Sequence, residues 1–197
     1  MSQRDRAAHN TGSYYKSFNN VTGILAALVA ASPLISSVLP SDLALYFFPP
    51  LGQINWLARI GAVVFTLLAT YVAFFLRAGN SARRVVLAFG AGFVFFASFL
   101  LLTFRFVRTI DIPSQNSSVT VSVGFHKTEF AEKNFPSDTD WKMLRQRGTS
   151  DEEIERLWTP SSVAIARLAL WVTCVGFLVA CTFSLCFGVL LTASAEI

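Results

Sequence analysis

Ionisable side chains are missing from four long apolar runs of this 197-residue chain. None of these runs contains Asp, Glu, His, Lys or Arg; they are residues 21–39, 60–76, 85–104 and 168–192. Ionisable residues inside a membrane commonly mark proton relays, ion paths or catalytic centres. Their absence at mid-depth therefore argues against catalysis or proton transfer within a bilayer.

Cysteine and histidine are also scarce. All three cysteines lie in the last apolar run: Cys174, Cys181 and Cys186. This placement excludes a disulfide framework in the polar part of the chain, and zinc-ligand spacing is absent. The two histidines, His9 and His126, are far apart, and no hydrolase, dinucleotide, phosphate-loop or EF-hand motif occurs. We therefore expect no catalytic residues, no cofactor and no metal, and predict that the protein is not an enzyme.

Hydrophobic residues make up 53% of the chain and charged residues only 14%. A hydrocarbon core about 30 Å thick needs roughly 20 helical residues, so each apolar run is a spanning candidate. The sequence predicts an all-α polytopic membrane protein, a four-helix transmembrane bundle with a small α+β hydrophilic insert between helices 3 and 4. The expected segments are a basic N-terminal tail (1–20), transmembrane helices 1–3 (21–108), the insert (109–161) and transmembrane helix 4 (162–197).

The net charge of +4 is unevenly distributed. Residues 109–161 hold six Lys and Arg against nine Asp and Glu, so the excess positive charge flanks the apolar runs. This distribution is typical of membrane topology and does not indicate nucleic-acid binding. The basic residues near the short loops favour cytoplasmic termini and an extracytoplasmic insert in a cell or inner membrane. The opposite orientation stays open, as does cleavage of the first run as a signal peptide after Ala31, which would leave three spans.

The insert is predicted to form a β-hairpin and two short helices. The hairpin would pair 106–112 with 119–125, and the second strand alternates with Val119, Val121, Val123 and Phe125 on one face. A lone hairpin is marginal in water, so it needs a cover: its own helices, the membrane surface or another subunit. The helices would span 138–147, capped by Ser137, and 151–158, capped at 149–150.

The second insert helix is followed almost directly by the last span. The predicted helix ends at Trp158, Thr159 supplies the cap of the next helix, and Pro160 suits its first turn. We predict that Trp158, Thr159 and Pro160 form a hinge through which movement of the insert would reach transmembrane helix 4.

Four arginines are expected at the membrane face below the insert: Arg59, Arg105, Arg108 and Arg167. Three interpretations stay open for this candidate anion or lipid-headgroup cluster. The arginines would reach lipid phosphates beside an aromatic belt, form a positive ring at a pore mouth, or pair with the acidic insert. Arg167 and Trp171, one helical turn apart, would also suit a cation–π pair.

Small residues recur at every fourth position of the last span: Gly176, Ala180, Ser184 and Gly188. Such stripes let helix backbones approach closely within a membrane. The stripe would pack the bundle within one chain or form a seam between copies of the chain.

These observations favour a non-enzymatic integral membrane protein, an oligomerising or complex-forming helical bundle whose 109–161 insert contacts a partner or ligand. Its expected partners are the lipid bilayer and either further copies of the chain or another membrane protein. The alternative is an insert-gated ion channel or membrane-permeabilising effector with an anion-attracting arginine cluster. A third hypothesis is an enzyme at the lipid interface that uses His126, Glu129 or Asp140. It has the least support, because the spacing of these residues forms no nucleophile–base pair.

Overall fold

The computed structural model describes residues 31–32, 35, 48–52, 55–75, 81–112, 117–148 and 150–194. In this part the chain is mostly helical and contains a two-stranded sheet, which confirms the coarse fold prediction. The N-terminal tail and nearly all of the first predicted span lie outside the described residues. The fourth helix of the predicted bundle therefore stays a prediction.

Three long helices dominate the structure: α3 (Asn55–Phe75), α4 (Ser81–Phe106) and α8 (Pro160–Ser194). They contain apolar stretches of 18, 24 and 29 residues that qualify as membrane spans. At 1.5 Å per residue these stretches are about 27, 36 and 43 Å long, close to or above the thickness of a hydrocarbon core. The three helices indicate an integral membrane protein.

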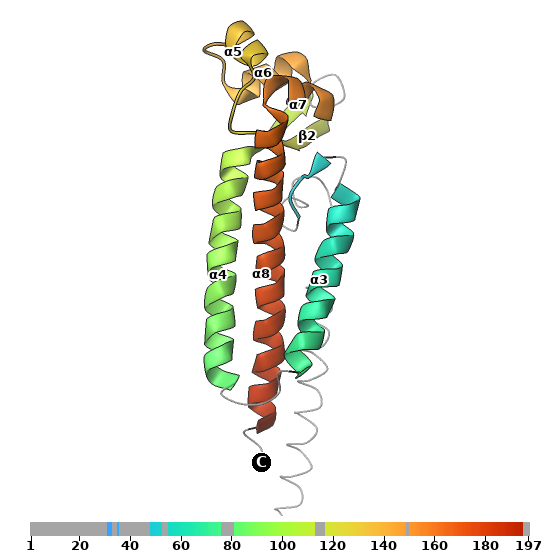
Figure 1. Cartoon of the computed structure of the whole chain (residues 1–197), viewed down its shortest axis with the longest axis vertical. Helices are drawn as coiled ribbons and strands as arrows, with labels where there is room; N and C mark the ends of the chain where they lie inside the picture. Colours follow the sequence, from blue (N-terminus) through green and yellow to red (C-terminus); the bar gives the residue numbers. More distant parts are fainter. Residues whose placement is uncertain are drawn as a thin grey trace, which may run out of the picture.

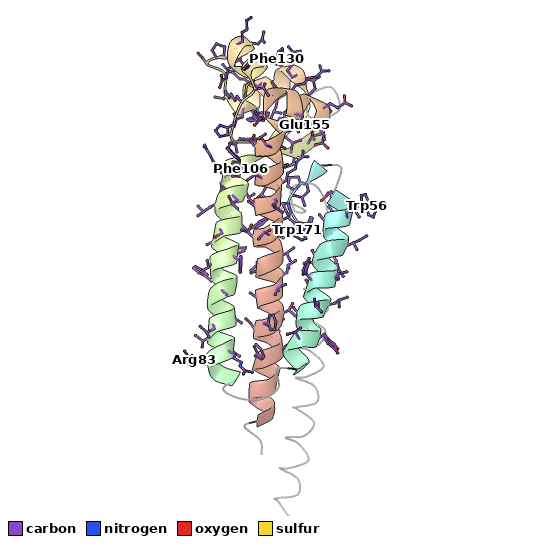
Figure 2. The ribbon with its side chains drawn as sticks, in the orientation of Figure 1. Trp56, Arg83, Phe106, Phe130, Glu155 and Trp171 are labelled. Atoms are coloured by element: carbon purple, nitrogen blue, oxygen red, sulfur yellow. The ribbon has the colours of Figure 1, made fainter. Side chains whose placement is uncertain are left out.

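Helix α8 lies between α4 and α3 (Figure 1). Ala62 and Thr66 of α3 are fully buried, and the Thr66 hydroxyl donates to the Ala62 carbonyl within the helix. Trp171 of α8 donates its indole N–H to the Ala58 carbonyl oxygen at 3.0 Å. Figure 2 shows this ring between α8 and α3, whereas Trp56 points away from the helices. The predicted cation–π pair of Arg167 with Trp171 is wrong, because the indole is turned towards α3.

The sheet follows α4 without a linker. Strand β1 (Val107–Ile112) pairs antiparallel with β2 (Ser117–Ser122), with Val107 opposite Ser122 and Ile112 opposite Ser117. After β2 the Val123 N–H donates to the Phe106 carbonyl oxygen at 2.8 Å, so the returning chain is bonded to the end of α4.

Three short helices follow the sheet: α5 (Glu129–Asn134), α6 (Asp140–Arg147) and α7 (Asp151–Leu157). We call the described residues between 107 and 159 the polar module. Its core includes Ile110 and Val121 from the strands, Met143 and Leu144 from α6, and the fully buried Leu157 from α7. The helices of the module itself therefore cover the hairpin, one of the three covers considered above.

Several details of the predicted insert are wrong. It has three short helices instead of two, because Thr128 caps an additional turn at α5 by accepting from the Ala131 N–H at 3.2 Å. Helix α6 begins at Asp140, and its N-cap is Thr139 instead of Ser137. The second strand ends at Ser122, so Phe125 leaves the buried face, is 42% exposed, and packs edge-on against Phe106.

Candidate functional site

A largely buried ion pair joins the polar module to α8. Arg167 donates from Nη2 to the Asp151 carboxylate at 2.5 Å and from Nε to Ser122 Oγ at 2.9 Å. The two charged side chains are only 13% and 19% exposed. Asp151 is the first residue of α7 and Ser122 the last of β2, so one guanidinium holds three elements together. We call Asp151, Arg167 and Ser122 the joint.

A glycine allows the chain before α3 to reach the joint. Gly52 has φ of 66°, and a Cβ there would lie 2.6 Å from an Asp151 oxygen and 2.8 Å from Arg167 Nη1. The neighbouring Leu51 and Phe48 are buried against α8 and α4, which fixes this backbone in place. The joint is thus closed on one side by backbone that leaves no room for a side chain.

A second ion pair holds the other edge of the module. Arg108 Nη2 lies 3.4 Å from the Asp140 carboxylate, and its Nη1 donates to the carbonyl oxygens of Phe104 and Val107 at 2.9 Å each. These bonds fasten α6 to the place where α4 becomes β1. Asp140, considered above as a catalytic group, is engaged in this structural contact.

Hydrogen bonds hold the predicted hinge against residues 126–128 of the same chain. Trp158 is 2% exposed and forms a β-bridge with Lys127. The Thr128 N–H donates to the Leu157 carbonyl and the Thr159 N–H to the His126 carbonyl, both at 3.0 Å. Pro160 begins α8, as its fixed φ and missing N–H favour. These bonds hold the connection between α7 and α8 in a fixed position.

The four candidate arginines have different surroundings. Arg108 and Arg167 pair with acids of the polar module, which is the third interpretation given above. Arg59 lies over the Phe48 ring at 5.6 Å, and within the described residues its buried Nε has no hydrogen-bond acceptor. Arg105 is exposed in the last turn of α4. Two of the four charges are therefore matched within the chain.

The small-residue stripe of α8 faces α4 over part of its length. A Cβ on Gly176 would lie 2.7 Å from the Phe95 ring, and one on Gly92 would lie 3.4 Å from the Ala180 Cβ. Ser184 donates to the Ala180 carbonyl and lines an apolar cavity of about 360 Å³ between α4 and α8. A Cβ on Gly188 would meet nothing within 4 Å. The upper stripe packs within the chain, whereas the seam between copies stays untested.

A larger cavity of about 560 Å³ adjoins the joint. Its upper wall contains Asp151 and Glu155 of α7 together with Arg167. Its lower wall is apolar and includes Leu57 of α3 and Leu168 of α8. We call this cavity the boundary groove, because it joins polar and apolar surfaces where the module meets the long helices.

The contacts described above are ion pairs, hydrogen bonds and aromatic contacts. The described residues contain no group of three or more His, Cys, Asp or Glu side chains placed to hold a metal ion. The His126 ring contacts the Phe125 ring in a tilted arrangement, with 4.7 Å between the ring centroids and 59° between the planes. The chemistry available at the joint is ion pairing, hydrogen bonding and the binding of an amphipathic molecule in the groove.

The sequence predicts the four arginines as a cluster but does not predict which acid each of them pairs with. No pattern in the sequence singles out Asp151, Ser122 or Gly52 as neighbours of Arg167. The one available signal was charge complementarity between the acidic insert and the basic membrane face. In the comparisons with known proteins, no family model, curated protein or solved structure matches this chain.

Proposed function

We propose that the protein is a non-enzymatic integral membrane protein that presents its polar module to a partner protein or to a further copy of the chain. The observation that carries this proposal is an exposed aromatic–arginine pair on α6. Trp141 is 45% exposed, and the Arg145 guanidinium lies 5.0 Å from its ring centroid. Trp and Arg are among the residues enriched at the energetic centres of protein interfaces.

The position of this pair supports the proposal. Met143 and Leu144 of the same helix are fully buried, so Trp141 and Arg145 lie on the side of α6 that points away from the module core. Phe130 of α5 is a second exposed aromatic residue, and Arg147 stacks on it at 4.9 Å. Figure 2 places Phe130 at the end of the molecule far from Arg83. A module carrying such side chains outside its core is suited to binding a macromolecular surface.

The rigid mounting of the module supports the same function. Both covalent connections to the long helices, at 106–107 and 158–160, carry hydrogen bonds or ion pairs. A rigidly held surface loses little conformational freedom when it binds, which increases affinity. The proposal includes cytoplasmic termini and an extracytoplasmic module, which protease accessibility in intact cells would test.

The experiment measures particle mass in lipid nanodiscs for the wild type, the double variant Trp141→Ala/Arg145→Ala and the control Lys142→Ala. Lys142 lies on the same helix, and its side chain is 58% exposed. We expect a wild-type particle heavier than one chain, dissociation in the double variant, and no change in the control. A wild type that is a monodisperse single chain without a co-purifying protein would overturn the proposal.

The channel alternative gains no specific support from the described residues. An anion-attracting ring needs unpaired charge, and Arg108 and Arg167 are matched by Asp140 and Asp151. The cavity between α4 and α8 is lined mainly by aromatic and aliphatic side chains. We therefore propose assembly as the function that the geometry supports best.

A further inference from the structure

The boundary groove has an amphipathic lining at the level where a membrane headgroup region would lie. Its volume of about 560 Å³ falls within the usual range of small-molecule sites. Figure 2 shows Glu155 beside the start of α8 and Trp171 further along the same helix, and both residues line the groove. The groove therefore runs from a charged wall on the polar module to an apolar wall on the spanning helices.

The charged wall favours a cation. Two carboxylates and one guanidinium line the groove, which gives a formal charge of −1. The guanidinium of Arg167 is already bonded to Asp151 and Ser122 and is 13% exposed, so little of it is open to an anion. Glu155 is exposed, and in the described part of the chain its carboxylate has no ion-pair or hydrogen-bond partner. Glu155 is thus the group to which a ligand cation would bind.

The apolar wall indicates that the cation belongs to a lipid. Leu57 and Leu168 are 54% and 59% exposed and lie within the stretches of α3 and α8 that are able to cross a membrane. Hydrocarbon chains alongside these helices would cover such side chains, while a soluble amine would leave them exposed.

The acceptor and the single aromatic ring in the groove favour a primary amine over a quaternary one. Quaternary ammonium groups are typically held by several aromatic faces, and Trp171 is the one aromatic residue among the described residues that line the groove. Its ring packs edge-on against Phe65 at 5.9 Å, and its N–H is donated to Ala58. A primary ammonium has three N–H donors and suits a carboxylate acceptor.

We propose that the boundary groove binds phosphatidylethanolamine, with the headgroup ammonium at Glu155 and an acyl chain along Leu168 and Leu57. This inference goes beyond the proposed partner surface, the Trp141 and Arg145 side of α6, because it uses a different face of the protein. A specifically bound lipid would stabilise the junction between the polar module and α8, because it would contact α7, α8 and α3 together.

The experiment uses the purified full chain, delipidated and then exposed in detergent micelles to equal amounts of phosphatidylethanolamine, phosphatidylcholine and phosphatidylglycerol. Native mass spectrometry counts the lipid molecules retained. We expect the wild type and the control Glu152→Gln, an exposed acid of α7 outside the groove, to retain phosphatidylethanolamine preferentially. Glu155→Gln should reduce that preference about fivefold, the size expected for an accessible charge pair.

A charge reversal gives a positive readout. Glu155→Lys changes the formal charge of the lining from −1 to +1 and should turn the preference towards phosphatidylglycerol. Equal retention of the three lipids by the wild type, or a preference unchanged by Glu155→Gln, would overturn the proposal. Displacement of the lipid by free phosphoethanolamine at equal concentration would overturn the role of the apolar wall. Lipid retention and particle mass are separate readouts, so failure here leaves the partner surface untouched.

Discussion

The polar module and the long helices place their large apolar side chains in opposite ways. Met143, Leu144 and Leu157 of the module are fully buried, whereas Leu101 and Phe104 of α4 are 71% and 80% exposed. The module therefore has the core of a small water-soluble domain, while the outer faces of α3 and α4 suit a lipid environment. Helix α8 belongs to both regions, because Val163 joins the core of the module and Leu170 packs with α3 and α4.

The largest effect should come from breaking the joint between the two regions. Arg167→Ala removes a largely buried ion pair together with the bond to Ser122, which should lower the free energy of unfolding by about 3–5 kcal/mol. The control Arg156→Ala removes a surface pair whose arginine is 67% exposed, which should cost about 0.5 kcal/mol or less. Thermal unfolding in one detergent measures both variants. Similar losses of stability in the two variants would show that the joint does not hold the polar module and the long helices together.

Leucine truncation on the two sides tests the contrast in packing. Leu144→Ala would leave a cavity in the core of the module and should cost about 2–5 kcal/mol. Leu101→Ala would remove a side chain from an exposed face of α4, where lipid fills the space, and should cost far less. The same unfolding assay compares them. Equal destabilisation would contradict the assignment of that face of α4 to lipid.

The next effect concerns close packing between the long helices. Gly176→Ala would place a methyl group 2.7 Å from the Phe95 ring, so overpacking should cost about 1–3 kcal/mol. Gly188→Ala, on the same stripe, meets nothing within 4 Å and should be neutral or slightly stabilising. The measurement is thermal stability of the detergent-solubilised protein. An equally harmful Gly188→Ala would instead indicate a contact at that position with another chain.

The smallest effect concerns helix caps within the module. Ser150 Oγ accepts from the Glu153 N–H at 3.3 Å at the start of α7, so Ser150→Ala should cost about 1 kcal/mol. Thr139 occupies the same position before α6 but makes no side-chain cap bond, so Thr139→Ala should change little. Hydrogen exchange of the two helices would distinguish the variants. A reversed order of destabilisation would show that capping does not govern these helix starts.

Local patterns in the sequence predicted the elements but not the contacts between them. Hydropathy identified α3, α4 and α8, and alternation of Val119, Val121 and Val123 indicated the sheet, because these signals depend on neighbouring residues. Helix α5 was missed because it has only six residues and depends on the Thr128 cap. Gly52 lies far from Asp151 and Arg167 in the sequence but next to them in the structure. No periodic pattern in the sequence predicts a contact of this kind.

The central claim is that the polar module is held rigidly on α4 and α8. Hydrogen–deuterium exchange in lipid nanodiscs tests it at three amides beside the junctions: Val123, which bonds to Phe106 of α4, and Thr128 and Thr159, whose bonds hold residues 157–159 just before α8. The structure predicts that these amides exchange as slowly as those in the core of the module, and that Arg167→Ala accelerates them. Exchange at the rate of open loops in the wild type would contradict the claim, because the module would then move independently of the long helices.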